Sequence, residues 1–153
     1  MRASTFLSEL WLPLPPQEVF PFFAEARNLQ EITPPWLSFR VLSQRPRSMG
    51  QGTVIDYRLR LHGVPLRWRS EITVWEPPHR FVDVQRRGPY RLWEHDHLFL
   101  PHDGGTLVRD RVRYAVPGGP LLAPLLDRLL VRPDLERIFA YRRRRLLELL
   151  GGG

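Results

Sequence analysis

The C-terminal segment from Pro120 to Leu150 carries the only long helical period in the sequence, with apolar residues spaced by three and four positions. Its apolar residues are Leu122, Leu125, Leu126, Leu129, Leu130, Leu135, Ile138, Phe139, Leu146, Leu147 and Leu150. Polar residues, including Arg128, Arg137 and the run from Arg142 to Arg145, fill the opposite face. The spacing predicts an amphipathic helix that lays its apolar stripe on a partner surface. Pro133 removes a backbone donor inside this run, so we expect a kink there or two abutting helices.

The rest of the chain predicts mainly strands. Extended segments, several of them with clear apolar–polar alternation, cover about residues 3–12, 39–43, 53–62, 64–74, 80–86, 90–100 and 106–116. Two short helices, one beginning at Pro16 and one over about 27–32, lie between the first two segments. Alternation with period two indicates an antiparallel sheet with one covered face, which the terminal helix is long enough to cover. The pattern leaves the inner face of residues 80–86 undecided.

Length and composition are those of a single globular domain over residues 1–150, followed by the glycine tail 151–153. The absence of cysteine excludes disulfides, thiolate metal ligands and a cysteine nucleophile. No apolar run approaches the roughly eighteen residues of a membrane span, and no leader pattern opens the chain. We therefore expect a soluble, cytoplasmic protein.

This order of elements, together with the segment from Pro16 to Phe23 and the sequence Pro34-Pro35-Trp36, resembles the helix-grip superfamily. That superfamily (SRPBCC) includes START domains, Bet v 1-like proteins and polyketide cyclase/dehydrase-like proteins. The stretch from Phe81 to His97 is similar to a bacterial ligand-binding subgroup whose function is mostly unassigned. The resemblance implies an α+β fold of the form β-α-α-β6-α, in which a curved antiparallel sheet of about seven strands wraps a long C-terminal helix. It also implies a cavity for an apolar molecule, but the activity does not follow from the fold.

Polar residues occupy several positions that should face inward: Tyr57, Ser70, His95, His97, Asp110 and Tyr114. The turn at residues 101–105 must place Asp110 opposite either His95 or His97, so both registers predict a His–Asp contact. The favoured interpretation is mutual satisfaction of buried polar groups. The alternatives are a histidine acid or base, and a metal bound by the two histidines and Asp110. We expect no metal and no cofactor.

The concave face is also rich in aromatic residues. The full set of candidate ligand-binding residues is Tyr57, Trp68, Ser70, Trp93, His95, His97, Phe99, Asp110 and Tyr114. The tryptophans and tyrosines of this set, Trp68, Trp93, Tyr57 and Tyr114, would line the cavity around the ligand. His95, His97 and Asp110 would orient the polar end of the ligand.

Three functions are compatible with these features. The first is binding of a hydrophobic small molecule or lipid between sheet and helix. The second is a cyclase or dehydratase that acts on a polyketide-like substrate, with His95 or His97, the weak catalytic candidates beside Asp110, as acid or base. The third is an interaction module for nucleic acid or an acidic protein, which would use the arginine-rich surface of a chain with net charge +7. The run from Arg142 to Arg145 spreads around a helix and makes no single stripe, so a solvated face is favoured over a nucleic-acid partner. The pattern gives no oligomeric state.

Overall fold

The computed structural model describes residues 2–151, and its order of elements confirms the α+β prediction. The elements are β1 (Ser4–Leu12), α1 (Pro16–Phe23), α2 (Asn28–Glu31), the 3₁₀ turn η1 (Pro35–Leu37), β2 (Arg40–Arg45), β3 (Val54–Leu61), β4 (Val64–Glu76), β5 (Arg80–Arg87), β6 (Leu92–His102), β7 (Gly105–Ala115), α3 (Gly119–Leu126), the π-helical turn η2 (Asp127–Val131) and α4 (Arg132–Leu150).

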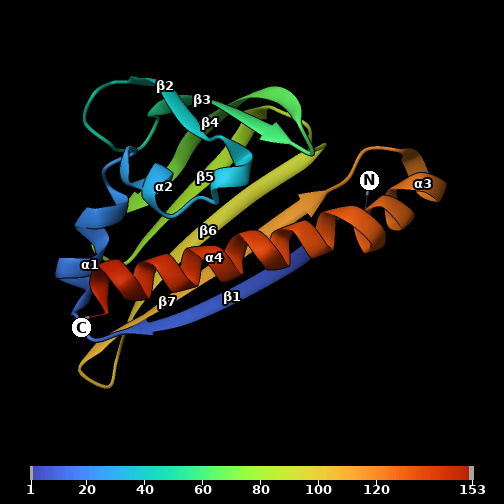
Figure 1. The fold of residues 1–153 in the computed structure, drawn as a ribbon. Helices are drawn as coiled ribbons and strands as arrows, with labels where there is room; N and C mark the ends of the chain where they lie inside the picture. Colours follow the sequence, from blue (N-terminus) through green and yellow to red (C-terminus); the bar gives the residue numbers. More distant parts are fainter. Residues whose placement is uncertain (1, 152–153) are drawn as a thin grey trace.

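All seven strands belong to one sheet, in the order β1-β7-β6-β5-β4-β3-β2, and every neighbouring pair is antiparallel. The sheet bends around α4, which crosses its concave face (Figure 1). This is the predicted helix-grip arrangement. The outer face carries many of the arginines in ion pairs, such as Arg69 with Asp56 at 2.9 Å and Arg109 with Glu9 at 2.7 Å.

The alternation predicted for the strands is largely confirmed. Trp93, His95, His97 and Phe99 of β6 face inward, as do alternate residues of β3 and β7. The alternation fails in β4, where the register with β5 shifts between Ile72 and Val74. A bulge reverses the faces of the residues that follow it. Regular alternation from Trp68 and Ser70 would have turned Val74 inward, but Trp75 packs against the core instead.

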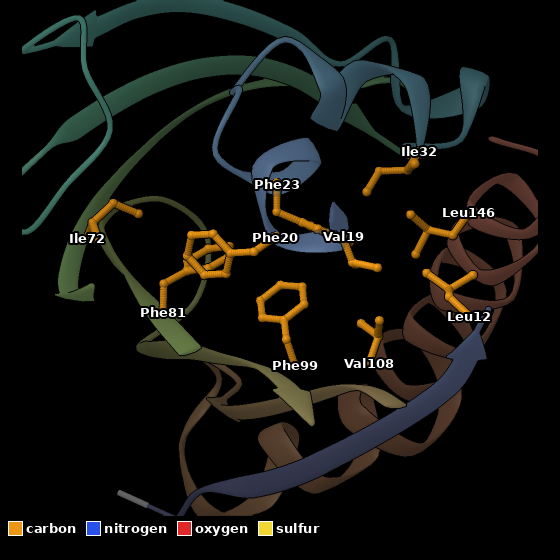
Figure 2. Packing of buried hydrophobic residues seen from close by; sticks show 10 residues of the cluster. All are labelled: Leu12, Val19, Phe20, Phe23, Ile32, Ile72, Phe81, Phe99, Val108 and Leu146. Carbon is orange, nitrogen blue, oxygen red and sulfur yellow. The ribbon is translucent and has the colours of Figure 1, made fainter. Parts of the chain in front are cut away.

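The main core lies between α1, the lower part of the sheet and the end of α4 (Figure 2). Val19, Phe20 and Phe23 recur on one face of α1 and are buried. The Phe20 ring contacts the Phe99 ring edge-on at 5.1 Å. Leu146 closes this core from α4.

The long C-terminal helix is interrupted near Pro133, as predicted. Pro133 lies in the first turn of α4, directly after η2. A proline cannot donate to the carbonyl one turn earlier, and its ring crowds that carbonyl, so a wider π turn before it is a natural accommodation. The helix ends at Leu150, and Gly152 and Gly153 of the predicted glycine tail lie outside the described residues.

The predicted apolar stripe is correct for α4 but wrong for α3 and η2. Leu135, Phe139 and Leu146 are buried. Leu147 of α4 is an exception and is exposed. All six leucines of α3 and η2 are exposed: Leu121, Leu122, Leu125, Leu126, Leu129 and Leu130. Their helical segment reaches the end of the sheet, where Asp127 hydrogen-bonds to Ser4 and Tyr114, the last paired residues of β1 and β7. Little sheet surface therefore remains for the leucines to cover.

None of the helices among the described residues is long and apolar enough to cross a membrane.

Candidate functional site

A cavity of about 170 Å³ lies between the middle of the sheet, α4 and the segment from α2 to β2. Its lining residues are Leu29, Ile32, Thr33, Leu37, Phe39, Tyr57, Leu59, Leu61, Trp68, Ser70, Asp83, Tyr90, Trp93, His95, His97, Leu135, Ile138, Phe139 and Arg142. Most of these side chains are apolar or aromatic, and the carboxylate, the two imidazoles and the guanidinium come from β5, β6 and α4. An apolar hollow with a few convergent polar groups is the usual form of a small-molecule site.

One wall of the cavity is aromatic. The Trp68 and Trp93 rings meet edge-on at 5.2 Å, and the Tyr90 ring lies 4.9 Å from Trp93. The Trp68 indole N–H donates to Ser70 Oγ at 3.0 Å, which satisfies both polar groups. Trp68 lies opposite Tyr57 in the β3–β4 register, so the two side chains share the concave face.

The polar end of the cavity begins with His95, whose Nε2 lies 2.8 Å from Asp110 Oδ1. The predicted His–Asp contact is therefore present. In the register, however, Asp110 lies opposite His97, and His95 lies opposite Val112. The hydrogen bond runs diagonally between the strands, which long side chains on one face can span.

His97 uses a different carboxylate, that of Asp83. His97 Nε2 lies 2.6 Å from Asp83 Oδ2, and the imidazole is stacked between the Phe81 ring at 3.9 Å and the His95 ring at 3.6 Å. Asp83 lies opposite His95 in the β5–β6 register. The structure thus resolves the undecided face of residues 80–86, because Phe81 and Asp83 point toward α4.

Arg142 of α4 completes the polar end, although the helical pattern placed it on the outer face. Its Nη2 lies 3.2 Å from Asp110 Oδ1 and 3.4 Å from His97 Nδ1. The guanidinium lies over the Phe23 and Phe139 rings, at 5.4 and 5.7 Å from their centroids. Among the described residues, Arg142 Nε has no hydrogen-bond partner although it is buried. One strong donor at the polar end is therefore left over.

We call these five residues, Asp83, His95, His97, Asp110 and Arg142, the buried polar cluster. Burial by itself raises the pKa of Asp110, but the Arg142 charge and the hydrogen bond from His95 outweigh it and hold that pKa well below its usual range. Asp110 and Arg142 therefore form a compensated ion pair. Burial raises the pKa of Asp83 and, with a smaller contribution from His95, holds the pKa of His97 well below its ordinary value. Both shifts disfavour an isolated charge on this second pair.

The charge on Asp110 determines which nitrogen of a neutral His95 is available to a ligand in the cavity. The ionised Asp110 can only accept a hydrogen bond, so a neutral His95 must carry its proton on Nε2. Its Nδ1 then presents a lone pair, and the nearest carboxylate oxygen, of Asp83, is 4.0 Å away. An imidazole oriented by a carboxylate, with its second nitrogen available, is the arrangement of a general base.

A metal could be held by Asp83, His95 and His97, whose potential ligand atoms all lie within 4.8 Å of one another. Imidazole and carboxylate suit zinc. Asp83 replaces the Asp110 that the sequence suggested as third ligand, because Asp110 pairs with Arg142. The nearby guanidinium charge disfavours a second cation, so the cluster fits an anionic or oxygen-bearing group better than a metal.

The candidate residues divide into two groups. Tyr57, Trp68, Ser70, Trp93, His95 and His97 line the cavity. Phe99, Asp110 and Tyr114 do not: Phe99 fills the main core, Asp110 lies behind the histidines, and the Tyr114 hydroxyl donates to Asp127 at 2.6 Å. Three further titratable residues line the cavity but were not among the candidates from the sequence: Asp83, Tyr90 and Arg142. Tyr90 was expected to begin the strand over residues 90–100, on the face opposite Trp93, but it precedes β6, so the alternation of that strand does not apply to it.

The arginine run does not form one surface, as its helical spacing implied. Arg142 is buried, Arg143 donates to Ser8 at 2.6 Å, and Arg145 bonds to Glu31 and Glu148. Arg144 is the most exposed of the four, with its side chain 67% accessible. These arginines mainly hold α4 to its surroundings.

The sequence matches a family model described as polyketide cyclase / dehydrase and lipid transport, over residues 12–137. The chain belongs to this family. The match spans β2 to β7, the cavity lining up to Leu135 and the first turn of α4, so most of the cavity lies within the part of the chain that matches the family model.

Several solved structures have the same fold. The protein TTHA0849 from Thermus thermophilus is 22% identical, with a TM-score of 0.66 over 95% of this chain and 99% of that one. The Zhui aromatase/cyclase from Streptomyces sp. R1128 is 14% identical, with a TM-score of 0.70 over 99% of both chains. A Thalictrum flavum norcoclaurine synthase is 13% identical, with a TM-score of 0.68 over 96% of both. At these identities the likeness shows the shared fold. No protein with curated annotation matches the sequence.

Proposed function

We propose that the protein binds a hydrophobic small molecule, with the apolar part of the ligand against the aromatic wall and an oxygen-bearing group against the buried polar cluster. The observation that carries this proposal is the cavity itself, which is apolar over most of its lining and charged at one end. The polyketides and lipids named in the family description are ligands of this kind.

Two features of the polar end favour an anionic or carbonyl oxygen. Arg142 lines the cavity, and within residues 2–151 its buried Nε–H has no hydrogen-bond partner. A buried donor left unpaired costs free energy, which a ligand oxygen would recover. His95 offers a second polar contact from β6. Neither residue would favour a ligand that is apolar throughout.

A suitable probe is 2-naphthoic acid, which joins two fused rings to one carboxylate. We expect it to quench the fluorescence of Trp68 and Trp93 in a saturable way, because both indoles line the cavity. Replacing Ile138, which lines the cavity from α4, by the larger tryptophan (Ile138→Trp) should fill the space and abolish saturable binding.

The matched control is Leu147→Trp on the exposed side of α4, which adds the same ring away from the cavity. It should bind 2-naphthoic acid as the unmodified protein does. Equal binding by the Ile138→Trp variant, or no saturable binding by the unmodified protein, would overturn the proposal.

The Asp110–His95 pair favours a second candidate function, proton abstraction next to a carbonyl. His95 Nδ1 would take the proton, Asp110 would hold the imidazole in position, and Arg142 would stabilise the negative charge that develops on the oxygen. Cyclases and dehydratases acting on polyketide-like chains begin with such a step.

This second function can be tested with acetophenone in deuterated water. His95 would remove a methyl proton to give the enolate, and a deuteron would return to the same carbon. NMR should show faster loss of the methyl proton signal with the unmodified protein than with the His95→Gln variant, while both bind 2-naphthoic acid. If the unmodified protein gives no acceleration over buffer, proton transfer at this site is refuted and the binding function stands alone.

A further inference from the structure

The segment formed by α3 and η2 exposes an unusual amount of apolar surface. Of the residues described in these two elements, none is buried. The leucines occur in pairs, one helical turn apart: Leu121 with Leu122, Leu125 with Leu126, and Leu129 with Leu130. Leu121 is 88% exposed and Leu129 is 64% exposed. We call this set of six residues the leucine face.

The orientation of the leucine face is fixed from its opposite side. Ala123, Asp127 and Val131, each four residues apart, point toward the protein: Ala123 and Val131 pack against a hydrophobic cluster, and Asp127 bonds to Ser4 and Tyr114. The leucines therefore cannot rotate inward without breaking these contacts, and their exposure is a property of the fold.

Positive charge lies beside the leucine face, around a hollow whose lining includes Ala123 and Asp127 from the inner side of the segment. This surface hollow beside α3 is also lined by four arginines, Arg2, Arg91, Arg128 and Arg132. The one acidic residue between Val116 and Pro133 is Asp127, and its carboxylate is engaged by two hydroxyl groups. Apolar side chains on one face of a helix, flanked by arginines, are the composition of helices that lie in the interface of an anionic bilayer.

We propose that α3 and η2 dock on the surface of an anionic lipid bilayer, with the leucine face among the acyl chains and the adjacent arginines, Arg128 and Arg132, against lipid phosphates. A second copy of this chain is the less suitable occupant. A symmetric dimer through the leucine face would bring the same arginines of two copies together, in a chain of net charge +7. An anionic bilayer supplies the opposite charge.

The docking segment adjoins the cavity. Ala123 and Val131, on the inner side of the segment, pack in the same cluster as Tyr90, Trp93 and Ile138, which line the cavity. The docking itself does not depend on the cavity.

The test is sedimentation of the protein with vesicles of phosphatidylcholine alone or mixed with phosphatidylglycerol. The unmodified protein should sediment with the mixed vesicles and much less with phosphatidylcholine. Combining Leu121→Ser, Leu125→Ser and Leu129→Ser should weaken partitioning by at least about tenfold, because three inserted side chains are lost. Arg128→Gln should weaken it by about fivefold.

Matched controls change the same residue types elsewhere. The triple change Leu7→Ser, Leu42→Ser and Leu147→Ser, at leucines of comparable exposure, and Arg144→Gln on α4 should leave partitioning unchanged. The Ile138→Trp variant should also dock normally, which separates this proposal from that of ligand binding. Absence of sedimentation with the mixed vesicles, or equal sedimentation of the leucine-face variant, would overturn the proposal. So would sedimentation velocity showing a dimer that the leucine-face changes dissociate.

Discussion

Asp110 accepts a hydrogen bond from His95 at 2.8 Å, although the β6–β7 register places His97 opposite it. Arg142 reaches the same oxygen, Asp110 Oδ1, from α4. One carboxylate thus links two strands and the helix that crosses them. His97 is left to pair with Asp83. This division separates an ion pair, Asp110 with Arg142, from a second pair in which burial raises the pKa of Asp83 and lowers the pKa of His97.

Asp110→Asn should be strongly destabilising, because it leaves the Arg142 charge buried without a counter-ion. We expect the free energy of unfolding in urea to fall by about 3–5 kcal/mol. Asp96→Asn, which breaks the pair between Asp96 and Arg80 on the outer face, should cost about 1 kcal/mol or less. A loss below about 1 kcal/mol for Asp110→Asn would contradict the assignment of a buried ion pair.

Stability should depend on pH through His97. Its pKa is held well below 6.5 in the folded protein by burial, so the unfolded chain binds the proton more readily. The contribution of neutral His97 is fully present above about pH 6.5 and is lost as the pH falls toward the lower folded value. Asp83, with its raised pKa, acts in the opposite sense: its contribution is present at low pH and is lost as the pH rises through that pKa.

Between about pH 6.5 and 5, the free energy of unfolding should therefore fall by up to about 1.4 kcal/mol per pH unit. His97→Gln, which keeps a hydrogen-bonding group near Asp83, should flatten this slope. His79→Gln, in an exposed turn, should leave it unchanged. An unchanged slope in His97→Gln would show that His97 does not determine it.

Phe99 should behave as a core residue and not as part of the ligand site. Its ring is fully buried among Phe20, Phe23 and Phe81, so Phe99→Ala should lower the free energy of unfolding by about 3–5 kcal/mol. Trp36→Ala, at a ring that is 56% exposed, should cost much less. Comparable losses from the two changes in thermal or urea denaturation would contradict this placement.

Arg142→Leu should separate recognition of charge from recognition of apolar surface. The affinity for 2-naphthoic acid should fall by about tenfold or more, because a charged hydrogen bond contributes about 1.5–3 kcal/mol. The affinity for 2-methylnaphthalene, which lacks the carboxylate, should change by less than about threefold. The same ratio of the two affinities in the variant and the unmodified protein would show that the guanidinium does not contact the ligand.

The strand order, the covered face and the His–Asp contact could be predicted because alternation fixes which residues share a face. The face on which Asp83 lies could not be predicted, because Phe81 and Val82 are neighbours in β5 and both are buried, so the strand shows no alternation there. Arg142 did leave a signal: it continues the spacing of Leu135, Phe139 and Leu146, although a run of four arginines suggested a wet face. The leucine face was misassigned because periodicity shows that a stripe exists and not how far the sheet beneath it extends.

The most direct test of the proposed site is a crystal structure of the protein with 2-naphthoic acid. We predict that the rings lie in the cavity against Trp68 and Trp93, with the carboxylate within hydrogen-bonding distance of Arg142 or His95. A ligand bound only at the leucine face, or a carboxylate turned away from the buried polar cluster, would contradict the account.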